Sequence, residues 1–355
     1  MTAAPQLEVL ASGAFASLQD AGRRGYRRVG VPWAGVLDRR LMRIANALVG
    51  NAEAAPVIEC FDGGLQLAAR GGAVRIALAG DALVELERGG ERQALAGWRS
   101  LLLGDGDVMR IKRIGAERIV MVAVEGLQLP AVLGSASTYA RAALGGIDGR
   151  PLAAGARLPA VAATDRREQM LPEPPRAGSG PIRVIAGPQA DFFSDAGLRD
   201  FADTDYRVTT DADRMGVRLE GPPLEHIGKR EIVSDATVPG SIQVPGNGQP
   251  IVLLADAQTA GGYPKIATVI GADLPRLAAT RPGQLIRFAF VDAAEGERLA
   301  RSAEAETRAL LASLRPLLIG GVDEAALYGA NLVTGAIDAL SAEYRPLLAA
   351  ADRLS

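Results

Sequence analysis

Short apolar runs rich in valine and isoleucine recur along most of the chain, and glycine and proline separate them. Between Val57 and Val124 these runs follow one another at intervals of about ten residues, with Gly-Gly and Gly-Asp turns between them. Short runs with turn signals at this spacing are typical of antiparallel sheets in sandwiches and barrels. The pattern therefore predicts a mainly β protein.

Helical periodicity is confined to a few segments. A helix is predicted after Asp38, a good N-cap residue, because one helical face is apolar at Leu41, Ile44, Ala45 and Leu48. Short helices are predicted over 138–144 and over 273–279, the latter capped by Asp273. From Ala293 onward, leucines lie in an alanine- and arginine-rich background, which predicts a helical tail over 293–355. Gly320-Gly321 interrupts it, and one or two further helices are expected over 323–352.

The domain division follows from one charged, proline-rich segment that ends in Gly-Ser-Gly-Pro. We predict an N-terminal β domain over 1–165, a linker over 166–181, a C-terminal β domain over 182–292 and the helical tail over 293–355. The segments LDRRLMR and ADRMGVR are alike and occupy similar places in the two halves. This weak repeat favours two related β domains.

The most informative stretch is 239–271. Two buried apolar runs, Ile251–Ala255 and Ile266–Ile270, follow a shorter run around Ile242–Val244. The connection over 256–265 carries a carboxylate, an amide, a hydroxyl, a phenol and an ammonium group. A plain hairpin needs none of these groups, and polar loops held by buried strands often carry binding or catalytic residues.

Within this stretch, Lys265 lies among apolar neighbours, and desolvation would make its amine a base or an electrostatic clamp. Asp256 ends an apolar run and is either the ion-pair partner of Lys265 or a carboxylate that orients a substrate amide. Gln243, Gln258 and Thr259 offer hydrogen bonds that suit an amide or ureido group. The residues alone leave a second interpretation open, in which Asp256 and Lys265 form a structural salt bridge at a strand end.

Two further polar segments lie in the N-terminal half. The segment 16–34 carries one glutamine, one aspartate, one tyrosine and four arginines: Gln19, Asp20, Arg23, Arg24, Tyr26, Arg27 and Arg28. It is either a solvated loop or a site for an acidic or carbonyl-bearing group, since arginine forks bind carboxylates and phosphates. Ser135, Ser137, Thr138 and Tyr139 either line a pocket or cap turns.

The amino-acid composition excludes several classes of function and site. The chain of 355 residues has a net charge of −2 and 4% aromatic residues, which argues against a dedicated nucleic-acid binder. One histidine, His226, excludes a histidine-rich metal site, and no metal is expected. One cysteine, Cys60, is predicted to be a buried, inert thiol and fits a reducing cytoplasm. No secretion signal and no membrane span are evident, so a cytoplasmic protein is expected.

Long motifs resemble a known family. DADRMGVRLEGPPLEH at 211–226, the segment over 234–288 and SLQDAGRRGYRRVGVPWAGVLDRRLMRIANALVGN at 17–51 are similar to the allophanate hydrolase subunit 2 family. The resemblance covers about residues 6–292. This family includes the C-type component of bacterial 5-oxoprolinase, the B half of the urea carboxylase carboxyltransferase domain, and the Kip-antagonist proteins.

The resemblance implies two cyclophilin-like β-barrel domains and a sister protein of the B type, also called the Kip-inhibitor type. It implies three possible functions. One is the C-type component of an ATP-dependent 5-oxoprolinase, which works with an A-type and a B-type protein. The second is the B half of a biotin-dependent urea or amide carboxyltransferase, and the third is a non-catalytic regulator of the Kip-antagonist type. ATP is expected through the complex in the first, and biotin in the second.

Carried over residue by residue, the resemblance implies a site from both halves of the chain. Catalytic roles are expected for Lys265, Asp256 and Tyr263. Substrate binding is expected for three glutamines, two aspartates, two arginines and one threonine: Gln19, Asp20, Arg23, Asp213, Arg214, Gln243, Gln258 and Thr259.

Overall fold

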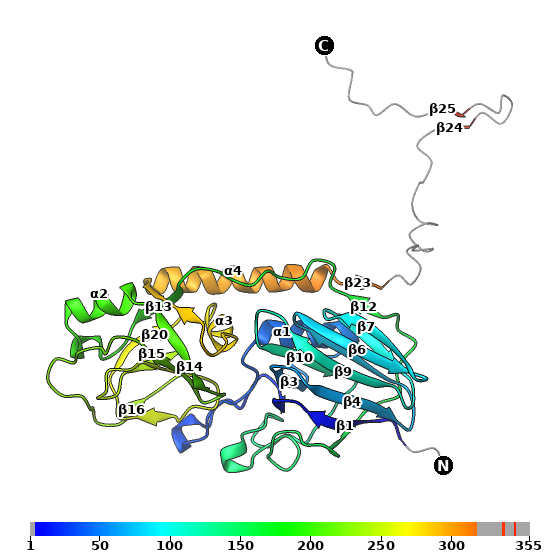
Figure 1. The fold of residues 1–355 in the computed structure, drawn as a ribbon, viewed down its shortest axis with the longest axis horizontal. Coiled ribbons are helices and arrows are strands. Elements are labelled where there is room, and N and C mark those ends of the chain that lie inside the picture. The colour runs from blue at the N-terminus through cyan, green and yellow to red at the C-terminus, as the bar shows by residue number, and fades with distance from the viewer. Residues whose placement is uncertain (1–3, 318–335, 338–343, 346–355) are drawn as a thin grey trace. The chain divides into compact units, whose positions relative to one another are not determined.

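The apolar runs of the sequence form strands in the computed structural model, which describes residues 4–317, 336–337 and 344–345 (Figure 1). Residues up to Arg315 form one compact unit, and Pro316–Ser355 form a second. In the second unit, β24 (Ala336–Ile337) pairs with β25 (Tyr344–Arg345). These four residues are therefore extended rather than helical, and the rest of the helical prediction for 323–352 lies outside the described residues.

The N-terminal half contains two antiparallel sheets. The first has the order β11-β1-β4-β9-β6-β7, with strands Arg157–Pro159, Gln6–Ser12, Leu65–Arg70, Val108–Ile114, Ala82–Arg88 and Glu91–Ala96. The second runs β2-β3-β10-β5-β8-β12, with strands Phe15–Gln19, Val57–Phe61, Ile119–Val124, Val74–Ala79, Arg99–Leu103 and Gln169–Met170. The short strand β12 lies inside the segment predicted as a linker.

These two sheets enclose a core of their own, formed by side chains such as Leu7 and Leu67 of the first sheet and Ile76 and Val120 of the second. The second sheet is buried on its other face as well, because helix α1 (Arg39–Val49) packs there. Burial on both faces explains why β10 reads IVMVAV, an apolar run without alternation.

The C-terminal half is built on an eight-stranded sheet with the order β21-β14-β15-β18-β17-β20-β13-β22. Its strands are Leu285–Ile286, Tyr206–Ala212, Gly216–Glu220, Ile251–Leu253, Ser241–Gln243, Lys265–Val269, Ile182–Ala186 and Phe288–Phe290. The pair β16 (Asp235–Ala236) and β19 (Ala260–Gly261) forms a separate small sheet. The three apolar runs of the stretch 239–271 thus form β17, β18 and β20, as the sequence predicted.

The remaining elements are helical. Three further α-helices are α2 (Asp195–Asp203), α3 (Leu274–Ala278) and α4 (Ala293–Ala312), and the short 3-10 helices are η1 (Arg27–Val29), η2 (Ala140–Ala142) and η3 (Ala190–Phe192). Asp38 caps α1 as predicted, since its Oδ1 accepts from the Leu41 N–H at 3.0 Å. Asp273 precedes α3 but makes no cap, because its carboxylate binds Arg183 instead. Helix α4 ends at Ala312, and β23 (Arg315–Pro316) follows it.

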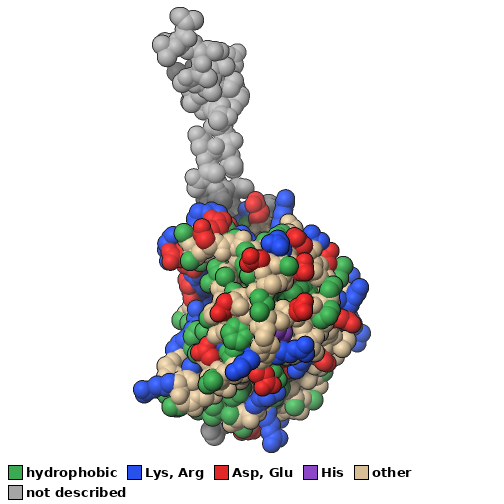
Figure 2. Space-filling model, turned by 90° about the vertical axis from the view of Figure 1, so that its left-hand side faces the viewer, with side chains coloured by type: hydrophobic (Ala, Val, Ile, Leu, Met, Phe, Trp, Pro, Cys, Tyr) green, Lys and Arg blue, Asp and Glu red, His purple; other side chains and the backbone are tan. Residues whose placement is uncertain are grey.

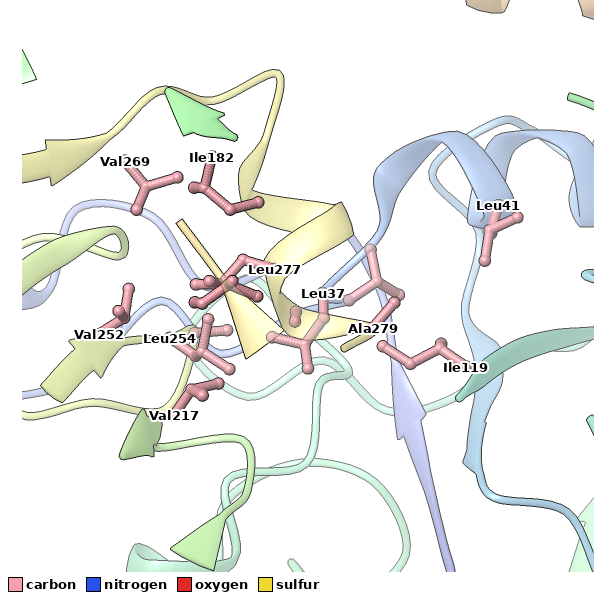
Figure 3. Close-up of a cluster of buried hydrophobic side chains, with 14 of the residues drawn as sticks. Leu37, Leu41, Ile119, Ile182, Val217, Val252, Leu254, Val269, Leu277 and Ala279 are labelled. Carbon is pink, nitrogen blue, oxygen red and sulfur yellow. The ribbon is translucent and has the colours of Figure 1, made fainter. Parts of the chain in front are cut away.

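One hydrophobic cluster joins the two halves. Helix α3 contributes Leu277, which lies between Leu37 from the N-terminal half and Leu254, the residue that follows β18 (Figure 3). Ile119 and Ala279 extend the same cluster toward the N-terminal sheets. Because buried apolar side chains are shared in this way, the two halves hold residues at their junction in a fixed geometry.

The structure confirms the mainly β fold. On the face seen in Figure 2, basic and acidic side chains are interspersed, in keeping with a net charge of −2. No helix within the described ranges is long and apolar enough to cross a bilayer.

Candidate functional site

Lys265 lies on β20 with only 2% of its side chain exposed. Its Nζ donates to Asp235 Oδ2 at 2.8 Å, and that carboxylate also accepts from Gln189 Nε2 at 3.2 Å. The hydrogen bond from Lys265 is the main reason that the pKa of Asp235 is lowered. The proposed pairing of Lys265 with Asp256 is therefore wrong, because the small sheet β16–β19 brings Asp235 to the ammonium group.

An amide pair lies beside Lys265, since Gln243 on β17 is its partner in the sheet register. Gln258 Nε2 donates to Gln243 Oε1 at 3.1 Å, and Gln243 is 2% exposed. The Nε2 of Gln243 is buried without a hydrogen-bond partner in the described part of the chain. A Cβ at Gly261 would lie 2.4 Å from that nitrogen, so a larger residue there would displace the Gln243 amide. The pair thus holds one unused amide donor in a fixed place.

Thr259 and Tyr263 lie at the surface of the same region. The Thr259 carbonyl accepts from the Thr237 N–H at 3.1 Å, and its side chain is half-buried. The Tyr263 side chain is 40% exposed. Both residues line the polar connection, but neither makes a side-chain hydrogen bond to Lys265 within the described residues.

Asp256 belongs to a different arrangement. Its two carboxylate oxygens accept from Nη2 and Nε of Arg214 at 2.9 and 3.0 Å. Arg214 also donates to Glu59 of the N-terminal half and, at 2.6 Å, to the Gly35 carbonyl. The Glu59 carboxylate in turn accepts from the Leu37 N–H at 2.7 Å. This Glu59–Arg214–Asp256 network joins the two halves of the compact unit.

The charges of this network are buried. Burial by itself would lower the pKa of Arg214, but Asp256 and Glu59 outweigh it and raise that pKa. Burial raises the pKa of Glu59, which has no exposed surface, although Arg214 opposes the shift. One guanidinium therefore binds two carboxylates. Of the three groups, Glu59 is the one whose ionised form is most disfavoured by its buried surroundings.

Asp213 stabilises the turn that precedes this network. Its Oδ1 accepts from the Met215 N–H at 2.7 Å and from the Gly216 N–H at 3.2 Å, and the residue is exposed. The side chain thereby fixes the turn that carries Arg214, two residues before β15.

The N-terminal segment forms a second polar cluster. Asp20 accepts from both serine hydroxyls of Ser135 and Ser137 at 2.6 Å, so these serines tie down a loop. Arg23 is fully buried and donates to three backbone carbonyls of the same loop, including that of Ser137 at 2.8 Å. Gln19 donates to the Thr138 carbonyl at 3.2 Å. Burial lowers the pKa of Arg23, and the carboxylates of Asp20 and Asp256 oppose this.

Three side-chain atoms of this cluster are buried without a hydrogen-bond partner among the described residues: Gln19 Oε1, Arg23 Nη1 and Thr138 Oγ1. Buried polar atoms are nearly always satisfied by protein, water or ligand. Arg27 connects the cluster to the C-terminal half, since it donates to the Thr237 carbonyl, and Thr237 Oγ1 donates to the Gln258 carbonyl at 2.5 Å. The two polar clusters are thus linked by direct contacts. In Figure 1, η1, η2 and β16 lie on the same side of the compact unit.

Sequence reasoning missed two acidic residues that the site uses. Glu59 stands inside the apolar run VIECF, and a lone carboxylate in a buried strand signals a buried ion pair. Asp235 gave no such signal, because it lies in an exposed segment far from Lys265 in the sequence.

The thiol and the imidazole take no part in these clusters. Burial raises the pKa of Cys60 to about 12, as expected for an inert thiol. His226 Nε2 lies 3.0 Å from the Val244 carbonyl, and its ring packs against Phe193. Across the residues with described positions, no group of three or more histidine, cysteine, aspartate or glutamate side chains is arranged to hold a metal ion.

The chain is similar in sequence to a known domain family and to two 5-oxoprolinase subunits. Residues 29–290 match the family described as carboxyltransferase domain, subdomain A and B. The chain is 36% identical to the C subunit of 5-oxoprolinase from Escherichia coli over 295 residues, which cover 79% of this chain and 90% of the relative. It is also 36% identical to the C subunit of 5-oxoprolinase from Haemophilus influenzae over 301 residues, covering 84% of this chain and 95% of the relative.

Larger proteins contain a similar region. Identity to the urea amidolyase of Lachancea kluyveri is 27% over 333 residues, which are 85% of this chain and 18% of that protein. The solved structure of the K. lactis urea amidolyase superimposes with a TM-score of 0.79 at 25% identity, covering 92% of this chain and 21% of that chain. The chain thus spans about a fifth of the length of these larger proteins.

Proposed function

Because the chain belongs to the carboxyltransferase domain family with subdomains A and B, we propose that it acts on the N–C=O group of an amide as the C-type component of an ATP-dependent 5-oxoprolinase. The reaction would open the ring of 5-oxo-L-proline to give L-glutamate. The observation that carries this proposal is the 36% identity to the C subunits of two 5-oxoprolinases over 90% and 95% of their lengths.

The chemistry of the site supports a small amide substrate. Its carbonyl oxygen needs donors, and the unused Nε2 of Gln243 and the ammonium of Lys265 are suitable ones. Its N–H needs an acceptor, and we propose the Oε1 of Gln19, which has no partner within the described part of the chain and lies in the N-terminal cluster that Arg27 links to Thr237 and Gln258. In this proposal Lys265 stabilises the negative charge that develops on the carbonyl oxygen as the lactam bond is attacked.

The other candidate residues complete the proposed site. Gln258 orients Gln243 through their hydrogen bond, and Thr259 and Tyr263 lie at the surface of the same region. Arg23 and Asp20 fix the loop that carries Thr138. Asp256, which pairs with Arg214, would act by holding the two halves together rather than by touching the substrate.

The proposed enzyme is active only with partner proteins. One is a B-type sister of the Kip-inhibitor type, and the other is an A-type protein. ATP would supply the driving force for ring opening through the complex. A cytoplasmic location is proposed with it, because a reducing compartment keeps a lone buried thiol such as Cys60 unchanged.

A second function is favoured by a specific observation, the TM-score of 0.79 against the K. lactis urea amidolyase. In this alternative the chain is the B half of a biotin-dependent carboxyltransferase that acts on urea or a related amide. The same donors would then bind a ureido carbonyl, and biotin would be carried by another protein or domain.

Reconstitution tests the proposal. The full chain is purified with its B-type and A-type partners, and glutamate and ADP are measured with and without 5-oxoproline. ATP-dependent glutamate formation is expected, and Lys265→Met should remove it while the complex still assembles. A stable complex that makes no glutamate would overturn the 5-oxoprolinase proposal. Carboxyl transfer from carboxybiotin to urea would then support the alternative.

A further inference from the structure

A groove of about 630 Å³ lies between the N-terminus of α1, helix α3 and helix α4. Figure 1 shows α4 extending above both α1 and α3. Neither Lys265 nor Gln243 lines the groove, so it is separate from the proposed amide site. Its volume is in the range of pockets that bind small organic ligands.

The charges in the groove are not balanced. Seven arginines and five carboxylates line it. Four of the arginines have carboxylate partners in the groove, namely Arg40, Arg43, Arg183 and Arg276. The other three, Arg24, Arg39 and Arg176, have no ion-pair partner within the described residues, and all three are exposed. Two of the carboxylates, Glu117 and Glu306, also lack an ion-pair partner there, so the lining carries a net excess of two positive charges.

Arg24 and Arg39 are close enough to repel each other. The part of the Arg24 side chain that is shielded from water lowers the pKa of this exposed residue, and the positive charge of Arg39 lowers it further. The guanidinium of Arg24 is stacked on the Trp33 ring, with its central carbon 4.0 Å from the ring centroid. Stacking on Trp33 fixes the orientation of the Arg24 guanidinium. Its N–H groups then point away from the ring, where they can donate to oxygen atoms of a ligand.

We propose that this groove is a binding site for a small molecule with a phosphoryl group, held by Arg24, Arg39 and Arg176 beside Trp33. A guanidinium fork matches the spacing of phosphoryl oxygens and binds them through paired hydrogen bonds. A single carboxylate would neutralise only half of the excess of two positive charges in the lining, whereas a phosphoryl group carries enough negative charge to neutralise both. This site also gives a role to Arg24, an arginine of the N-terminal segment that the proposed amide site does not use.

The inference goes beyond the proposed amide chemistry and stands without it. A nucleoside triphosphate and inorganic phosphate chains share the required chemistry, and binding to the isolated full chain distinguishes them. If the reaction proposed above consumes ATP, ATP is one molecule that could occupy the groove.

Isothermal titration calorimetry of the full chain with ATP and with tripolyphosphate tests the site. Saturable binding with a stoichiometry of one is expected for at least one of them. The double variant Arg24→Ala/Arg39→Ala should weaken binding at least about tenfold. Tighter binding of ATP than of tripolyphosphate would identify a nucleotide, and equal affinities would identify the phosphoryl chain as the ligand group.

Arg28→Ala is the matched control, because Arg28 is an exposed arginine of the same segment that does not line the groove. Its affinity should stay within about twofold of that of the parent protein. Absence of saturable binding to both probes would overturn the inference. So would an equal loss of affinity in the control, since that would show only a general attraction of anions to the basic segment.

Discussion

Two cations of the C-terminal half, Arg214 and Lys265, are both nearly excluded from solvent but are neutralised in different ways. Arg214 binds two carboxylates, Glu59 and Asp256, whose side chains are 0% and 12% exposed. Lys265 binds one carboxylate, Asp235, whose side chain is 49% exposed. The first arrangement is a closed network that joins two halves of the protein. The second leaves a buried ammonium with one partner at the surface.

This difference distinguishes a charge that stabilises the fold from a charge that is available to bind a ligand. Removing any member of a closed network leaves a buried charge without compensation, which is costly. An ammonium group whose one partner is accessible can instead exchange that partner for a ligand. For this reason we assign the amide chemistry to Lys265 and the joining of the two halves to Arg214.

The largest effect on stability is expected for Arg214→Met. The variant leaves the carboxylates of Glu59 and Asp256 buried and unpaired, and should lower the free energy of unfolding by about 3–5 kcal/mol. Urea denaturation measures this. Arg287→Met is the matched control, because it breaks an exposed ion pair with Asp205 in the same half of the chain and should change stability little. Similar losses in the two variants would contradict the distinction.

Lys265→Met should act on turnover rather than on folding. The thioether chain fills the space of the lysine stem, and Asp235 can be hydrated because it is half-exposed. We expect the reconstituted complex to lose at least about a hundredfold in kcat. Thermal unfolding should remain close to that of the parent chain. Full activity of the variant would exclude Lys265 from the reaction.

A smaller effect concerns pH and Glu59. Because its pKa is raised in the folded protein above the ordinary value of 4.5, the stability that it contributes is present below that value and is lost as pH rises. The stability of the parent protein relative to Glu59→Gln should therefore fall as pH increases from about 4.5 toward neutral. Denaturant unfolding of both proteins across this window is the measurement. A difference that grows with pH would mean that pairing with Arg214 outweighs burial.

The smallest effect on stability is expected for Tyr263→Phe. The ring is 40% exposed, and loss of the hydroxyl should change the free energy of unfolding by less than about 0.5 kcal/mol. Turnover by the reconstituted complex then shows whether the phenol contributes to the reaction. Unchanged kcat and KM would remove Tyr263 from the proposed site.

The sequence predicted the elements better than the contacts. Strands β17, β18 and β20 and helix α1 follow from apolar periodicity and from Asp38 as a cap, which are local properties. Asp256 and Lys265 are nine residues apart in the sequence, and this proximity suggested a pair that the fold does not form. Tertiary pairing instead joined Lys265 to Asp235, thirty residues away.

The amino-acid sequence by itself determined the mainly β fold and the family, because both rest on local patterns and long motifs. It also singled out the polar stretch at 256–265 and the arginine-rich segment at 16–34. Only the tertiary structure decided which charges meet. Glu59 and Arg214 are 155 residues apart, and their pairing depends on how two sheets pack around one shared core. Ion pairs over such separations are set by packing, which no short sequence window contains.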